Sequence, residues 1–251
     1  MELTITILFF IFGSVFGSFF NVVGLRIPTN NFLESKRSYC PQCNKNLSWY
    51  ELMPILSYIL QTGKCRGCKK RISSIYPTME LFTALLFALS YYLIGFQIEL
   101  LMALLLVSLC AIVIVSDIKY MLIPNKILLF FSPLILLVRM LSPLDPWWSP
   151  IVGSLLGFIM IFLIILISKG GMGAGDMKLF ALLGLIVGYQ GILLTFFLST
   201  LLGTIGSAIL LIRKKVDRKS PIPFGPFICI AACITYFFGQ DILNWYMTSF
   251  F

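Results

Sequence analysis

Two aspartates stand at the ends of long apolar segments, where a charged side chain is costly. Asp117 closes the run 113–117, and Asp176 follows the glycine-rich stretch 170–175. Ionisable side chains in or at the ends of membrane spans are functional candidates by default. Two carboxylates a few ångströms apart share a proton near neutral pH, so one can accept a proton from water while the other polarises a carbonyl group. The pair therefore predicts peptide hydrolysis without a covalent intermediate.

The residues around this pair fit the same chemistry. The chain contains no histidine, which excludes His-based triads and relays. Glycines before Asp176 permit an irregular backbone and the close approach of an extended substrate. We expect Gly173, Gly175 and Lys178 to support the catalytic loop. The alternative is that the two aspartates only cap their helices or pair with nearby lysines.

Four cysteines form a second cluster that could do chemistry. They occur as two C-x2-C pairs separated by 21 residues: Cys40, Cys43, Cys65 and Cys68. Four thiolates arranged in this way suit a tetrahedral zinc ion, and a reducing cytoplasm disfavours disulfides. Because protein would fill every position on the metal, we expect zinc to hold the loop together rather than to act on a substrate. A metal-free or redox-active tetrad is the alternative.

The elements that must position these residues are apolar helices. The 251 residues are 59% hydrophobic and 12% charged, with a mean hydropathy of +0.97, whereas soluble domains are about 25% charged. The apolar blocks have the length of a helix that crosses a hydrocarbon core of ~30 Å. The sequence thus predicts an all-α, polytopic membrane protein with eight spans. The spans are 3–23, 77–95, 98–116, 127–141, 150–168, 177–189, 191–212 and 222–240.

The distribution of lysine and arginine predicts how the chain is oriented in the membrane. All but one of the 19 lie in or beside segments that would share the cytoplasmic side, and Arg139 is the exception. Both termini are then outside, whereas the large loop 24–76 and both aspartates are cytoplasmic. This asymmetry accounts for the net charge of +9 without nucleic acid. We expect two domains: 1–76, the first span with its cysteine loop, and 77–251, a transmembrane peptidase domain.

Several short motifs, taken in order, resemble one known family. They are Phe16–Val23, Arg26–Pro28, the double cysteine pair, Tyr76–Glu80, Ile123–Asn125, Gly173–Leu179 and Pro223–Pro226. Over about residues 13–225 the chain is similar to bacterial prepilin peptidases, also called type IV leader peptidases, and especially to those of Gram-positive competence systems.

The resemblance implies a function and a set of site residues. Asp117 and Asp176 would be the catalytic aspartates of a GxGD-type peptidase in the bacterial cytoplasmic membrane. Its substrates would be prepilins or pseudopilins with a short basic leader, a glycine at the cleavage point and an apolar helix beyond it. The resemblance also implies N-methylation of the new N-terminus with S-adenosylmethionine, for which we name Asn21, Gly63 and Glu80. The residues themselves give no separate sign of methyl transfer, since no glycine-rich nucleotide loop follows a strand.

Three alternatives remain at this stage. Glu80 could form an ion pair with Arg71 or Arg26 instead of serving methyl transfer. The whole chain could be another intramembrane GxGD aspartic protease, although the cysteine loop argues against this. It could also be a transporter that uses the two aspartates as proton or cation sites, although such proteins often contain inverted repeats and binding sites at the membrane midplane.

Overall fold

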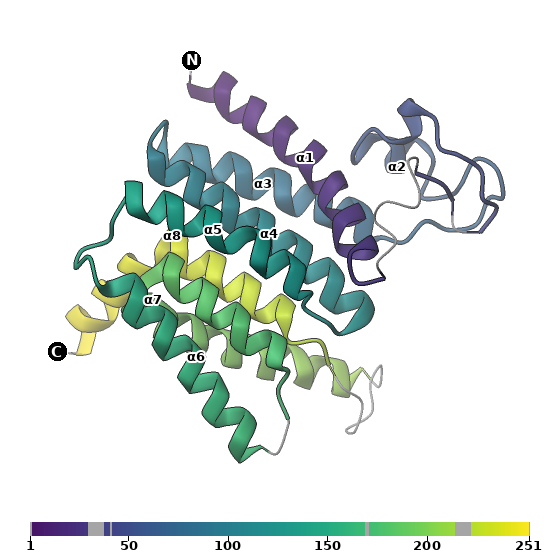
Figure 1. Ribbon diagram of the computed structural model, residues 1–251. Helices are drawn as coiled ribbons and strands as arrows, with labels where there is room; N and C mark the ends of the chain where they lie inside the picture. Colours follow the sequence, from purple (N-terminus) through teal and green to yellow (C-terminus); the bar gives the residue numbers. More distant parts are fainter. Residues whose placement is uncertain (1, 30–37, 41, 169–170, 214–221, 251) are drawn as a thin grey trace. The chain divides into compact units, whose positions relative to one another are not determined.

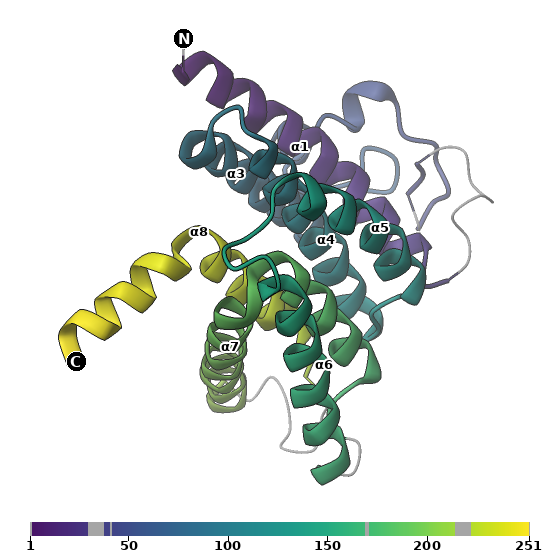
Figure 2. The same ribbon diagram turned by 60° about the vertical axis from the view of Figure 1, so that its left-hand side comes forward.

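The regular secondary structure of the described part is helical. The computed structural model describes residues 2–29, 38–40, 42–168, 171–213 and 222–250 (Figures 1 and 2). Among these residues the only β-type pairings are two isolated bridges. The helices in chain order are α1 (Glu2–Arg26), η1 (Trp49–Glu51), α2 (Leu56–Leu60), α3 (Ile75–Ile94), α4 (Ile98–Tyr120), α5 (Asn125–Leu141), α6 (Ser149–Ile167), α7 (Ala174–Ile212) and α8 (Gly225–Phe250). The predicted all-α class is confirmed.

Among the described residues, six helices are long and apolar enough to cross a membrane, which makes the chain a multi-pass membrane protein. They are α1, α3, α4, α6, α7 and residues 225–249 of α8. The predicted span 127–141 falls in α5, whose 17 residues extend for about 26 Å. The predicted spans 177–189 and 191–212 both fall in α7, which has 39 residues. The predicted count of eight spans is therefore not confirmed by helix length and composition.

The long helix α7 reverses its direction at Gly188. That residue has φ 73° and ψ −175°, a backbone conformation that glycine adopts readily and that no helix contains. The rings of Phe180 and Phe196 are 6.2 Å apart, although 16 residues of straight helix would separate them by about 24 Å. The two halves of α7 thus lie against each other as a helical hairpin. The sequence predicted a turn in this region, and the structure places it at Gly188.

The chain divides into two compact units, Met1–Phe96 and Gln97–Phe251. In the first unit, α1 packs along α3 in an antiparallel sense. A Cβ atom on Gly13 would lie 2.7 Å from the Cα atom of Ala84, and one on Gly17 would lie 2.9 Å from that of Glu80. Small residues allow two membrane helices to approach this closely, and dispersion contacts between backbones then hold them together.

The second unit is built around α4. Of its most apolar 18-residue window, 67% is buried inside the protein, compared with 22% for α6. Helices α5, α7 and α8 pack against α4, and α6 runs along α7, as Figures 1 and 2 both show. Gly153 of α6 and Gly184 of α7 meet backbone to backbone, which permits this close packing. The helices that carry the two aspartates therefore belong to one core.

Candidate active site and cysteine cluster

Asp117 lies in the last turn of α4, and it is only 6% exposed. One of its carboxylate oxygens accepts a hydrogen bond of 2.7 Å from the backbone N–H of Gly225, the first residue of α8. Its own carbonyl accepts the N–H of Met121, which ends the helix in a left-handed conformation. The carboxylate is thus held by a segment that lies 108 residues further along the chain.

Gly225 leaves no room for a side chain beside this carboxylate. A Cβ atom there would lie 2.8 Å from Oδ2 of Asp117 and 3.1 Å from its Cγ atom. The segment Pro223–Pro226 was predicted as part of a family motif, but no contact between Gly225 and Asp117 was predicted. The available signal was a glycine enclosed by Phe224 and Pro226 in a segment expected on the side of the aspartates.

Asp176 lies in the first turn of α7. Gly173 is the residue that caps this helix, and its backbone N–H donates to a carboxylate oxygen of Asp176 at 3.1 Å. The N–H of Asp176 donates in return to the carbonyl of Gly173, also at 3.1 Å. Asp176 therefore does cap a helix, as the alternative reading required, and this bond also fixes its carboxylate. It is 9% exposed.

The structure brings the two aspartates into one neighbourhood of the second unit. Gly175, next to Asp176, packs against Ile123, which lies in the short segment after Asp117 and the end of α4. The two buried aspartates therefore lie at the same end of this core. Two buried carboxylates, each held by a backbone N–H, can share a proton and act together on one water molecule and one peptide carbonyl.

Polar and steric contacts connect the beginning of α7 to the start of α5 and to the segment before it. The ammonium of Lys178 donates to the side-chain oxygen of Asn125, the first residue of α5, at 2.9 Å. A Cβ atom on Gly175 would lie 3.0 Å from that of Ile123, so glycine lets the first turn of α7 pack closely there. Gly173 serves as described for Asp176. Gly170, another glycine of the predicted loop, lies outside the described residues.

The four predicted cysteine ligands come together in the first unit. Their sulfur atoms all lie within 4.8 Å of one another. The Sγ atoms of Cys40 and Cys68 are 3.9 Å apart, and those of Cys43 and Cys65 are 4.0 Å apart. Four sulfurs at about 2.3 Å around a tetrahedral ion are separated by about 3.8 Å. The cluster could therefore hold a metal ion, with donor atoms that suit zinc.

The two C-x2-C pairs have the same backbone arrangement. In the first, the N–H of Cys40 donates to the carbonyl of Lys45, and Asn44 donates back to the carbonyl of Cys40. In the second pair, the N–H of Cys65 donates to the carbonyl of Lys70, and the N–H of Lys69 donates to the carbonyl of Cys65. The residue after each pair has a positive φ, 53° at Asn44 and 55° at Lys69. Each pair is thus a short local turn that presents two sulfurs on its own.

The thiols of the cluster differ in acidity. Backbone N–H groups of Cys68 and Gly67 lower the pKa of the Cys65 thiol to about 7. The backbone N–H of Lys45 acts in the same direction on Cys43, but desolvation and the neighbouring thiols outweigh it and raise that pKa to about 11. The thiol of Cys65 thus ionises easily, whereas that of Cys43 resists ionisation. A bound cation removes this conflict, because it stabilises all four thiolates together.

The residues named for methyl transfer all have structural contacts. Asn21 is 1% exposed and donates to the carbonyl of Tyr76 at 3.2 Å, while its side-chain oxygen has no partner among the described residues. A carboxylate oxygen of Glu80 accepts the N–H of Ile55 at 2.8 Å and so holds a residue whose φ is 60°. Gly63 has φ 66° and follows α2. Asn21 and Glu80 share the seam between α1 and α3, whereas Gly63 lies in the cysteine loop.

Comparisons with known proteins cover nearly the whole chain. Residues 11–94 match the family model for the bacterial peptidase A24 N-terminal domain, and residues 104–208 match that of the type IV leader peptidase family. The prepilin leader peptidase/N-methyltransferase of Bacillus subtilis is 41% identical over 95% of this chain and 96% of its own length. The protein of the same name from Aeromonas hydrophila is 32% identical over 97% of this chain and 94% of its own length. That from Pseudomonas putida is also 32% identical, over 92% of this chain and 90% of its own length. No solved structure matches the chain.

Proposed function

The chain belongs to the type IV leader peptidase family, and from this membership we propose that it is an aspartic endopeptidase that removes the leader from prepilins or pseudopilins. The observation that carries the catalytic assignment is the pair Asp117 and Asp176. Both are buried in one unit, each is held by a backbone N–H, and Gly175 beside Asp176 packs against Ile123 just beyond the helix that ends with Asp117. Paired carboxylates are the groups that hydrolyse a peptide bond without a covalent intermediate.

The proposed reaction uses one water molecule and one shared proton. The ionised carboxylate takes a proton from water as the water oxygen attacks the scissile carbonyl carbon. The protonated carboxyl donates its proton to the carbonyl oxygen, which gives a tetrahedral intermediate. As the C–N bond breaks, the leaving amine takes the proton that the first carboxylate had received from water, and a hydroxyl of the intermediate returns a proton to the second carboxylate. The proton belongs to the pair, so both aspartates share the roles of acid and base.

The membrane arrangement follows from the basic residues. We place the peptidase in the bacterial cytoplasmic membrane, with both termini outside and with the cysteine loop and both aspartates on the cytoplasmic side. A substrate would present its basic leader on that side and keep its apolar helix in the bilayer. Its peptide bond would have to unwind locally to reach the dyad.

The first unit is proposed to carry the second activity that the relatives' names contain. Residues 1–76, together with Glu80 of α3 in the same unit, would transfer a methyl group to the new N-terminus, with S-adenosylmethionine supplying that group. The rest of residues 77–251 would form the peptidase domain. Zinc on Cys40, Cys43, Cys65 and Cys68 would hold the loop in shape. Asn21 and Glu80 would then take part in methyl transfer at the α1–α3 seam. Gly63 would shape the loop that follows α2.

Cleavage of a purified pilin-like precursor in detergent tests this function. We expect Asp117→Asn and Asp176→Asn each to lower the rate by about 10²–10⁴-fold, because each removes one member of an acid–base pair. Asp241→Asn, an exposed aspartate of α8, is the matched control and should cleave normally. Labelled S-adenosylmethionine added to wild type tests the methyl step. A folded Asp117→Asn or Asp176→Asn protein that cleaves at nearly the wild-type rate would refute the two-carboxylate mechanism.

A further inference from the structure

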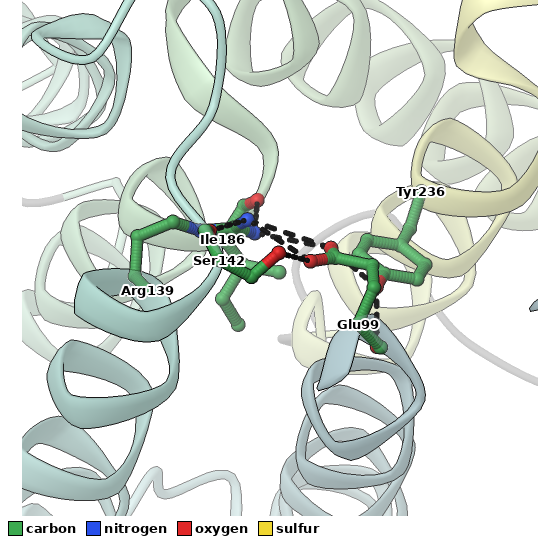
Figure 3. Close-up of polar contacts among 5 residues, drawn as sticks. All are labelled: Glu99, Arg139, Ser142, Ile186 and Tyr236. Atoms are coloured by element: carbon green, nitrogen blue, oxygen red, sulfur yellow. Dashed lines mark hydrogen bonds and ion pairs between the residues drawn. The ribbon is translucent and has the colours of Figure 1, made fainter. Parts of the chain in front are cut away.

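A buried polar network lies at the ends of the helices opposite to the aspartates. Arg139, near the end of α5, is 6% exposed, and its two terminal nitrogens lie 3.3–3.5 Å from the carboxylate of Glu99 at the start of α4. The hydroxyl of Ser142 donates to Glu99 at 2.9 Å, and that of Tyr236 on α8 donates at 2.8 Å. Figure 3 shows these side chains converging on the carboxylate.

Arg139 also reaches the bend of α7. Its Nη2 atom donates to the carbonyl of Ile186 at 2.6 Å, two residues before Gly188 (Figure 3). On the other side of the bend, the N–H of Tyr189 donates to the hydroxyl of Ser149 at 3.3 Å. A break in a membrane helix frees backbone groups that lipid cannot satisfy, so neighbouring side chains must take them up. Arg139 and Ser149 fill this role on the two sides of Gly188.

The network explains why Arg139 departs from the distribution of the other basic residues. A buried arginine in a membrane protein is costly unless it is paired and its remaining donors are used. Glu99 supplies the charge, and the carbonyls of Ile186 and Ser142 accept further hydrogen bonds, while the Nε–H has no partner among the described residues. An arginine placed only to orient the chain needs none of these contacts, so its position in the fold is better explained by what it holds.

The same pairs of helices are joined at two levels. At the level of the dyad, Asp117 joins α4 to α8, and Lys178 joins α7 to α5. At the level of the α7 bend, Tyr236 near the middle of α8 joins it to α4, and Arg139 joins α5 to α7. Along α4, the 18 residues from Glu99 to Asp117 correspond to about 27 Å. The network therefore lies out of reach of the bond that is cut, and any effect on cleavage must pass through the helices.

We propose that Arg139, held by Glu99 and Tyr236, is a positioning residue for the dyad. It fixes the bend of α7 against α4 and α5, and thereby sets where Asp176 meets Asp117. Packed helices transmit such a constraint because they move as rigid bodies, and a displacement of about 1 Å at a reacting group can cost up to a hundredfold in rate. This inference rests on the proposed peptidase function.

The test is the cleavage rate of Arg139→Lys in the full chain, with a purified pilin-like precursor. Lysine keeps a positive charge beside Glu99, but one ammonium cannot bond the carboxylate and the Ile186 carbonyl as the planar fork does. We expect kcat to fall by about tenfold and KM to change by less than about twofold, as for a lost transition-state interaction. Ser108→Ala is the control, because this α4 hydroxyl donates to Leu104 of the same helix. Its kcat should equal that of wild type.

Tyr236→Phe provides a second and milder variant, since it removes one hydroxyl and keeps the ring. We expect its kcat to fall by about two- to threefold at unchanged KM. Both losses should persist at temperatures far below the melting point of each variant. A kcat that returns to the wild-type value on cooling would mean that the network only stabilises the fold, and it would overturn the proposal. A raised KM with a normal kcat in these variants would also overturn the proposal.

The outcome separates this inference from the function on which it rests. If Asp117→Asn and Asp176→Asn are inactive while Arg139→Lys and Tyr236→Phe keep a normal kcat, the dyad stands and the positioning role is wrong. If the aspartate variants cleave normally, the proposed function itself fails. If Arg139→Lys does not fold, the result for Tyr236→Phe decides alone.

Discussion

The two compact units hold their candidate sites by different means. In the second unit, Asp117 and Asp176 are buried carboxylates fixed by backbone N–H groups and by the packing of α4, α7 and α8. In the first unit, four thiols come from two local turns, outside the membrane-length helices. The apolar core alone can hold the dyad in place. The four thiols can all ionise only when a bound cation stabilises their thiolates together, so the conformation of this loop should depend on a metal ion.

The largest effect that would sharpen this contrast is expected from Gly225→Ala. The new methyl group would lie 2.8 Å from Oδ2 of Asp117 and force the carboxylate to move. We expect cleavage to fall by about a hundredfold, while methyl transfer to a pre-cut pilin-like peptide stays normal. Gly239→Ala, also on α8, meets only the side chains of Thr235 and Leu194 at 3.2 Å or more and should cost far less. Normal cleavage by Gly225→Ala would show that the packing around Asp117 does not determine the rate.

Removal of metal tests the other half of the contrast. We expect purified protein to carry about one zinc ion per chain and Cys65→Ser to lose it. Methyl transfer to the pre-cut peptide should then fall by about tenfold or more, and cleavage should change by less than about threefold. Cys110→Ala changes a buried cysteine outside the cluster and should keep its zinc. If a chelator abolished both reactions equally, the two sites would not be independent.

A smaller effect is expected from Gly13→Ala at the seam of the first unit. Its methyl group would meet the Cα atom of Ala84 at 2.7 Å and separate α1 from α3. We expect thermal unfolding to show a loss of about 1–3 kcal/mol from overpacking. Cleavage measured well below the melting temperature should stay normal, since the dyad lies in the other unit. Ser14→Ala, whose hydroxyl bonds within α1, is the control, and an equal loss there would contradict the packing argument.

The smallest effect is expected from Lys178→Met beside the dyad. It removes one exposed hydrogen bond to Asn125, so cleavage should fall by about two- to threefold. Lys119→Met, an exposed lysine near the end of α4, should have no effect. A loss as large as that of Asp176→Asn would instead mean that Lys178 takes part in the chemistry.

Hydropathy and residue type predicted the main features of the fold and of the candidate site. Apolar length located the helices, because lipid requires every backbone group to be satisfied within a helix. The sequence also predicted an even number of spans between Asp117 and Asp176, which would put both on one side of the membrane, and that orientation stays a prediction. The C-x2-C spacing predicted the cluster, because the cysteines of each pair are too close in sequence to separate in space.

Contacts between distant segments could not be predicted in the same way. Nothing in the sequence around Asp117 indicates that Gly225 bonds it, because helix packing determines that contact. Arg139 was the exception to the predicted distribution of positive charge. Its partner Glu99 lies 40 residues earlier, and a backbone carbonyl such as that of Ile186 leaves no signal in the sequence of residue types. The matching backbone arrangement of the two cysteine turns was not predicted either. The residue types around Cys40 and Cys65 differ, although their backbone hydrogen bonds are the same.

The bend of α7 has a consequence for how the protein is made. Glu99 and Arg139 are synthesised before Ile186, and Tyr236 is synthesised last. The residues of the ion pair between α4 and α5 are therefore in place before the bend of α7 enters the bilayer. The Ile186 carbonyl can then bond Arg139 as soon as the bend forms, and Tyr236 of α8 adds the last contact. Assembly in the membrane can thus follow the direction of synthesis.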